Sequence, residues 1–171
     1  MTRSGGGGDS HGDAVAQTDG DAVRVPAGLI LKSTQAIPVL TGLINEANAS
    51  LLFQARQNAL CHALHPIDAR YCRWLLQASH ALESPLIDLT QESCAHALGV
   101  QRTSISMVAH AFQLRGGIRT RRGKIEILDP SQLEAVACEC YQKLKRRAQA
   151  RNARRLRLDR GSDEAFLATA R

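Results

Sequence analysis

Aromatic residues are scarce in this sequence, so a hydrophobic core must rest on Leu, Ile, Val and Ala. The 171 residues include one Trp, two Tyr and three Phe. No apolar run is long enough to span a bilayer, and no basic-then-apolar export signal opens the chain. We therefore expect a cytoplasmic protein with no membrane partner, made of one ordinary domain plus appendages.

Cysteine occurs in an odd number, five. Without an export signal, this number favours reduced thiols over disulfides. The alternative is a thiol or metal sensor site, in which Cys138 and Cys140, with or without Cys61, would act with His62 or His65. Neither the Cys-x-Cys pair nor the 61–65 run has a common zinc spacing. The sequence therefore favours buried or idle thiols, Cys72 and Cys94 included, and predicts no metal and no cofactor.

Catalytic patterns are also missing. No carboxylate pair, nucleophile with base, or Gly-Lys-Ser/Thr phosphate loop occurs at a telling spacing, so we expect no enzyme and no catalytic residue. The net charge of +6 instead favours a polyanionic partner. The charge alone fits either nucleic acid or an anionic membrane, and the partner expected for the whole chain is nucleic acid.

Residues 89–114 predict two short helices separated by Gly99. Thr90 is suited to cap the first helix, and Glu92 adds favourable charge in its first turn. Gly99 permits the positive φ of a sharp reversal. A second helix that opens at Thr103 or Ser104 would bury Ile105, Val108, Ala109 and Phe112. Its other side would expose a mostly polar set suited to base edges: Gln101, Arg102, Thr103 and Ser106, with Met107 beside them.

Residues 118–128 alternate apolar and polar side chains on both sides of Arg122-Gly123, which predicts a β-hairpin. A hairpin directly after a helix-turn-helix is the wing of a winged helix. Its tip carries Arg121, Arg122 and Lys124, which could meet a phosphate backbone.

The flanking segments are simpler. Residues 1–22 are rich in Gly and Asp and should be disordered, and 23–31 are ambiguous between a strand and an irregular edge. Residues 34–64 predict a long helix with Pro38 in its first turn. Its apolar residues are Ile37, Leu40, Ile44, Ala47, Leu51 and Ala55. This near-heptad stripe favours a dimer seam slightly over packing against the chain's own following domain.

After Pro66, a helix should bury Trp74 in the core, keep Arg70 and Arg73 at the flanks of its apolar side, and end at Ser84-Pro85. Another helix should start at Asp129-Pro130, with Leu133, Val136, Ala137, Cys140, Tyr141 and Leu144 on its apolar side. The Lys/Arg-rich segment 143–160 is either a helix extension or a basic arm.

Several motifs resemble the Crp/Fnr transcription regulators. They are Cys61-His-Ala-Leu-His65, Asp68-Ala-Arg-Tyr-Cys-Arg-Trp-Leu-Leu76, Leu89-Thr-Gln-Glu92, Leu98-Gly-Val-Gln-Arg-Thr-Ser-Ile105, Arg122-Gly-Lys-Ile-Glu-Ile-Leu-Asp129 and Cys138-Glu-Cys-Tyr141. The resemblance implies a mainly α fold with a small β-hairpin wing, in which a long dimerisation-type helix precedes a winged helix-turn-helix. It also implies a homodimer through helix 35–64, double-stranded DNA as partner and a contact with RNA polymerase.

The predicted DNA-binding residues are Thr90, Gln91, Gln101, Arg102, Thr103, Ser104, Ser106, Arg121, Arg122 and Lys124. The predicted segments are a disordered terminus (1–22), a sensor remnant with dimerisation helix (23–57), the winged helix (58–132), a C-terminal helix (133–142) and a basic tail (143–171).

The chain departs from the family in three ways. About 30 residues precede the long helix, too few for the eight-stranded sensor barrel of the family, so the sensor is expected to be missing. His62 stands where close relatives usually have Asn. Thr103 and Met107 replace an acidic residue and a second arginine of the reading helix. An alternative function is a barrel-less module that pairs with a full-length relative.

Overall fold

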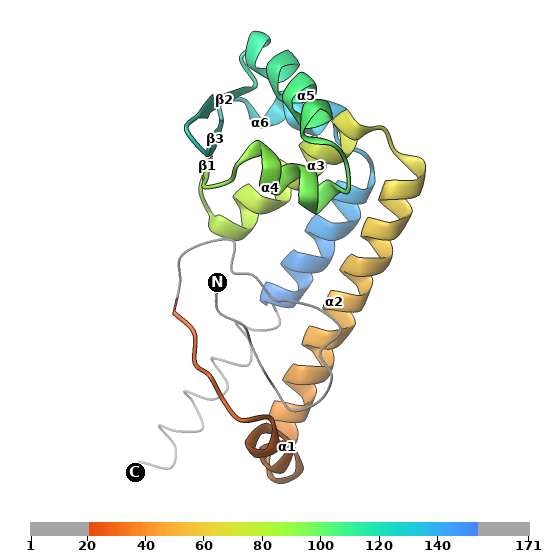
Figure 1. Ribbon diagram of the computed structural model, residues 1–171. Helices are drawn as coiled ribbons and strands as arrows, with labels where there is room; N and C mark the ends of the chain where they lie inside the picture. Colours follow the sequence, from red (N-terminus) through yellow and green to blue (C-terminus); the bar gives the residue numbers. More distant parts are fainter. Residues whose placement is uncertain (1–20, 154–171) are drawn as a thin grey trace, which may run out of the picture. The chain divides into compact units, whose positions relative to one another are not determined.

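The structure, a computed structural model, describes residues 21–153 (Figure 1). The chain divides into two compact units, Met1–Ala59 and Leu60–Arg171. The expected disorder of the N-terminus falls almost wholly outside the described residues, as does the basic segment beyond residue 153. Among the described helices, none is long and apolar enough to cross a membrane.

The first unit contains α1 (Ala27–Ala36) and most of α2 (Pro38–Leu64). The helix α1 corrects the extended or irregular reading of residues 23–31. Its first turn is closed by the Pro26 carbonyl, which accepts the N–H groups of Leu29 and Ile30 at 3.0 and 3.2 Å. The expected single helix over 34–64 is interrupted at Ile37 (φ −124°, ψ 93°). The ring of Pro38 disfavours helical geometry in the residue before it, while Pro38 itself fits the first turn of α2.

The second unit is built around α3 (Ile67–Leu82), whose Tyr71 and Leu75 are fully buried. Trp74 is only partly buried against this core, so the expectation that it anchors the domain is wrong. Because aromatic residues are scarce, most of the core consists of aliphatic side chains from the neighbouring helices and strands. The helix ends at Glu83, which is left-handed at φ 50°, just before the predicted Ser84-Pro85 break.

The two arginines expected at the flanks of α3 are in fact buried. Arg73 is 1% exposed, and its Nη1 donates to Gln77 Oε1 at 2.6 Å. Arg70 is 9% exposed, and its Nη2 donates to the carbonyl oxygen of Leu98 at the end of the next helix. The long side chains of both residues thus contribute to packing within the domain.

A small antiparallel sheet completes the winged helix, in the order β1–β3–β2. Its strands are β1 (Leu86–Ile87), β2 (Ile118–Arg121) and β3 (Lys124–Ile127). The predicted hairpin is confirmed: Arg121 pairs with Lys124. Between them Arg122 and Gly123 both have positive φ, 31° and 81°, as in the type I′ turn that matches strand twist. The buried strand residues Ile87, Ile125 and Ile127 face the core.

The last part of the described chain differs from the single helix expected after Pro130. The helix α6 (Pro130–Val136) is capped by Asp129, whose Oδ1 accepts the Ser131 N–H at 3.0 Å. It stops because Ala137 leaves helical geometry (φ −58°, ψ 138°). A new helical run covers 140–153, so the basic segment continues as a helix at least that far. The mainly helical fold with its small sheet is otherwise as predicted.

Candidate nucleic-acid interface

The helix-turn-helix consists of α4 (Gln91–Leu98) and α5 (Arg102–Leu114). As predicted, Thr90 caps α4: its Oγ1 accepts the Ser93 N–H at 3.0 Å. Gly99 adopts φ 62° and ψ 41°, which reverses the chain between the helices. The second helix begins at Arg102, slightly earlier than expected, so that Arg102 lies in its first turn.

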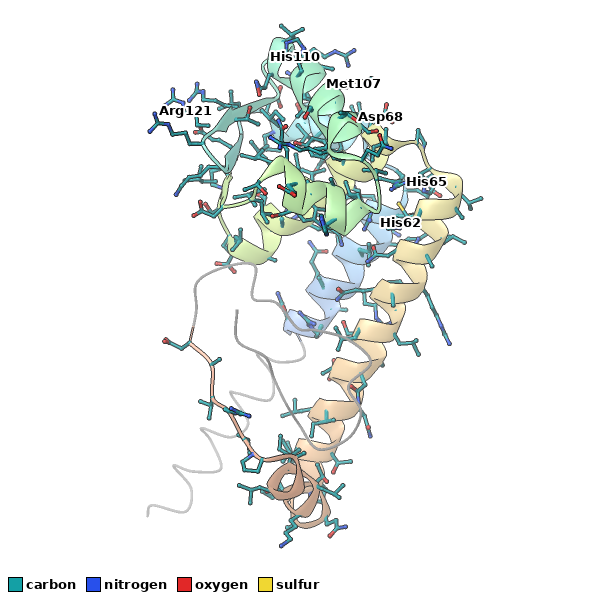
Figure 2. All side chains as sticks on the ribbon, viewed as in Figure 1. His62, His65, Asp68, Met107, His110 and Arg121 are labelled. Carbon is teal, nitrogen blue, oxygen red and sulfur yellow. The ribbon has the colours of Figure 1, made fainter. Side chains whose placement is uncertain are left out.

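One side of α5 is buried and the other is exposed. Ile105, Ala109 and Phe112 enter the core. On the outer side, Gln101, Arg102 and Thr103 are exposed, and Met107 keeps 73% of its accessible surface. An exposed side chain that the sequence reasoning missed, His110, follows Met107 by one turn (Figure 2). The three- and four-residue spacing from Thr103 through Met107 could have identified it.

The hairpin and the helix-turn-helix together form an open groove. It brings together six of the ten predicted residues, namely Thr90, Gln91, Arg102, Arg121, Arg122 and Lys124. Thr120 and Glu92, which were not predicted as site residues, also line it. The hairpin tip lies close to the start of α4, since a Cβ on Gly123 would stand 3.7 Å from Thr90 Cγ2. Figure 2 shows Arg121 on the hairpin and Met107 on α5.

The cations of the groove differ in how far they are neutralised. Lys124 Nζ lies 3.1 Å from Asp88 Oδ1 in an exposed ion pair. Within the described part of the chain, Arg102, Arg121 and Arg122 have no ion-pair partner. These three guanidinium groups are therefore available to an anion, and each can offer a planar set of donors.

Ser106, a predicted DNA-binding residue, is engaged inside the protein. Its Oγ lies 2.6 Å from Gln91 Oε1 and 3.1 Å from the carbonyl oxygen of Arg102. This contact joins the start of α4 to the first turns of α5, and Gln91 thus has a positioning contact besides its place in the groove. Of the remaining predicted residues, Gln101, Thr103 and Ser104 lie at the N-terminal end of α5 and do not line the groove.

Residue types that bind metals gather elsewhere in the same unit, where Cys61, His65, Cys138 and Cys140 face one another. None of these four lines the groove.

Comparison with known proteins agrees with this geometry. The family of the Crp-like helix-turn-helix domain matches residues 69–136. A transcriptional regulator of the Crp/Fnr family from Eubacterium rectale is similar in structure, with 25% identity and a TM-score of 0.52 over 65% of this chain and 51% of that one. FixK2 from Bradyrhizobium japonicum has the same fold at 14% identity, with a TM-score of 0.63 over 67% of this chain and 60% of FixK2. A search of curated protein sequences found no significant match.

The fold and the groove thus define a winged helix-turn-helix protein, a class used in transcription regulation. Its domain over residues 69–136 is a Crp-like helix-turn-helix domain, and the resemblance to Crp/Fnr regulators inferred from the sequence motifs is confirmed. The chain spans about half the length of the Eubacterium regulator that it matches, 51%.

Proposed function

We propose that this protein is a transcription regulator that binds double-stranded DNA, with α5 in the major groove and the hairpin on the phosphate backbone. The observation that carries the proposal is the groove that joins Arg102 of α5 to Arg121 and Arg122 of the hairpin. A recognition helix beside a basic wing meets base edges and phosphates in one docking position.

Base contacts come from the exposed N-terminal part of α5. Arg102 donates two hydrogen bonds to the N7 and O6 of a guanine, a contact worth about 1–3 kcal/mol of discrimination. Thr103 and Ser104 add hydroxyl contacts to bases or phosphates. The exposed Met107 offers an apolar surface to a thymine methyl group, and we include His110 as a further contact at the outer end of this face.

Phosphate contacts come from the start of α4 and from the hairpin. The N-terminus of α4 presents backbone N–H groups and a positive helix dipole, with Thr90 and Gln91 beside them. Arg121, Arg122 and Lys124 hold the backbone from the other side. Glu92 lines the same groove and opposes an anion, so the positive charges of Arg121, Arg122 and Lys124 must outweigh its negative charge.

We further propose a homodimer through α2. Its apolar stripe includes Leu51, which is 63% exposed, while Leu40 and Ile44 are half-buried within the chain. A second copy that covered this stripe would remove apolar surface from water. A symmetric dimer would then read two half-sites related by a two-fold axis. The cytoplasmic location and a contact with RNA polymerase belong to this proposal, because a bacterial-type regulator acts where DNA is transcribed.

The test begins with selection of bound duplexes from a random pool, followed by anisotropy titrations on the selected and on scrambled DNA at fixed salt. We expect Arg102→Ala to weaken binding to the selected site by about 1–3 kcal/mol and to spare scrambled DNA. Arg122→Ala should weaken both alike and reduce the slope of log K against log salt by about 1.

Arg119→Ala is the matched control. It removes the same charge from the hairpin, but Arg119 does not line the groove and pairs with Glu126 at 3.1 Å. Equal losses on selected and scrambled DNA for Arg102→Ala would refute its role in base reading. Equal losses for Arg119→Ala and Arg122→Ala would refute the groove as the phosphate site.

A further inference from the structure

Four side chains with metal-binding atoms converge at one point of the second unit. They are Cys61, His65, Cys138 and Cys140, and their ligand atoms all lie within 4.8 Å of one another. The three cysteines are buried, and the His65 side chain is 15% exposed. Three sulfurs and one ring nitrogen thus surround a single small volume, largely shielded from water.

The local backbone explains why the four ligands come as two pairs, each from one short segment of the chain. Cys61 and His65 are four residues apart at the end of α2, where the His65 N–H donates to the Cys61 carbonyl at 3.1 Å and keeps both on one face. Cys138 lies in the break that follows α6, and Cys140 is the first residue of the helical run 140–153. The Tyr141 N–H donates to the Cys138 carbonyl at 2.9 Å and closes that turn. The interruption of the expected helix therefore turns both cysteines toward the end of α2.

The distances between ligand atoms fit one tetrahedral ion. Zinc bonds of about 2.3 Å to sulfur and about 2.0–2.1 Å to nitrogen place neighbouring ligands of a tetrahedron about 3.5–3.8 Å apart. Cys61 Sγ lies 3.5 Å from Cys138 Sγ, and Cys140 Sγ lies 3.6 Å from His65 Nδ1. With all four atoms inside 4.8 Å, the site has room for one ion, whereas a cluster of several irons needs its cysteines spread around a larger core.

The second nitrogen of His65 supplies an independent observation. Its Nε2 lies 3.2 Å from Glu139 Oε2. A carboxylate at this nitrogen holds the ring proton there, so that Nδ1 presents its lone pair toward the sulfurs. A carboxylate behind the histidine is the usual outer partner of a zinc ligand. His65 Nδ1 is therefore oriented as a ligand.

The cluster is also separate from the main hydrophobic core. Besides its three cysteines it contains one further buried residue, Ala69. Such a small apolar group stabilises little by itself, whereas an ion bound by four ligands would cross-link the end of α2 to the segment after α6. Structural metal sites, in which the protein supplies all four ligands, stabilise proteins through such cross-links.

We propose that Cys61, His65, Cys138 and Cys140 form a structural Zn²⁺ site of the Cys₃His type, with Glu139 as the residue that positions His65. On binding, three thiols release their protons to solvent and His65 binds through Nδ1 in its neutral form. The ion takes no part in DNA contact, because its ligands lie outside the groove.

The test uses the full chain, reduced and then dialysed against Zn²⁺ before removal of the excess. Elemental analysis should give one zinc per chain, and competition with a chromophoric chelator should show tight binding. Co²⁺ in place of Zn²⁺ should give the intense visible bands of a tetrahedral thiolate site. Chelation should lower Tm by several degrees, and re-addition of Zn²⁺ should restore it.

Variants with matched controls locate the site. His65→Ala and Cys140→Ser should abolish stoichiometric zinc. His62→Ala, which removes an exposed histidine outside the cluster, and Cys94→Ala, which removes a buried thiol of the main core, should retain it. Glu139→Gln should keep the site but reduce zinc affinity about 10-fold or more, within the range found for outer partners. The Co²⁺ spectrum should persist in this variant.

Three results would overturn the proposal. The first is wild-type protein that takes up no zinc after reduction, including the case in which it is first isolated with a Cys61–Cys138 disulfide. The second is iron with a sulfide chromophore in place of zinc. The third is undiminished zinc in His65→Ala.

Discussion

Gly99 offers a direct test of how the turn between α4 and α5 is maintained. Its φ of 62° and ψ of 41° are left-handed, and its N–H lies against the carbonyl oxygens of Ala95 and His96. The Val100 N–H donates to the Ala95 carbonyl at 3.0 Å. A Cβ added at Gly99 would meet no heavy atom within 4 Å. The substitution Gly99→Ala therefore tests backbone conformation without a steric clash.

Because no steric clash contributes, the loss in free energy of unfolding can be worked out from the backbone conformation alone. A left-handed conformation costs an ordinary L-residue about 1–2 kcal/mol. The smaller entropy of the unfolded chain offsets part of this cost, so we expect Gly99→Ala to lower the free energy of unfolding by about 1 kcal/mol. For a domain of 60–100 residues this corresponds to a decrease in Tm of about 4–8 °C. Urea unfolding followed by far-UV circular dichroism measures the same quantity at constant temperature.

Two further substitutions make this test specific. Gly99→Asn should lose less stability, because asparagine tolerates the left-handed region better than alanine does. Gly116→Ala should lose about as much, since Gly116 has φ 73° and equally open space. Unchanged stability of Gly99→Ala, or an equal loss in Gly99→Asn, would refute the argument from φ.

The remaining two predictions concern a helix contact and a buried thiol. Ser106→Ala should lower the free energy of unfolding by about 0.5–1.5 kcal/mol by removal of the 2.6 Å contact with Gln91. A double-mutant cycle with Gln91→Ala should show coupling, and additive effects would contradict the contact. Burial raises the pKa of Cys94 from 9.0 to about 11, so the folded state holds a proton that the unfolded state loses. Stability should therefore fall as pH rises from about 9 to 11. The free energy of unfolding of Cys94→Ala, measured by urea titration, should fall less steeply across this range than that of the wild type. An identical pH dependence in the two proteins would contradict the raised pKa.

Features with local causes could be predicted from the sequence. The Thr90 cap needs only a hydroxyl before a helix, Gly99 needs only freedom from a Cβ, and Arg122-Gly123 needs only two residues that tolerate positive φ between alternating strands. Each is decided by neighbours within a few positions. For the same reason the groove was partly predictable: once the hairpin follows the helix-turn-helix, its tip returns to the start of α4.

Features that depend on distant contacts were predicted poorly. Arg70 and Arg73 have the polarity of surface residues, but Arg70 reaches the carbonyl oxygen of Leu98, 28 positions away. The burial of Arg70 depends on that acceptor, which has no local sequence signal. Arg73 bonds the nearby Gln77, and its burial depends on the space beside α3, which also has no local sequence signal. Trp74 shows the opposite error, because a large apolar ring is expected in the core but lies partly at its edge.

The Cys–His cluster shows why spacing alone is a weak criterion for metal sites. Common zinc spacings describe ligands supplied by one hairpin or one finger, in which sequence distance fixes spatial distance. Here the two ligand pairs come from segments 77 positions apart, joined where Cys61 meets Cys138. The spacings of Cys61 to His65 and of Cys138 to Cys140 do not match a zinc finger. They suit a site in which two separate chain segments each supply two ligands.

The domain then holds an open cationic groove for an anion and a closed thiolate cluster for a cation, with no residue in common. Loss of zinc should therefore affect DNA binding through stability alone, so that DNA affinity measured well below Tm stays unchanged.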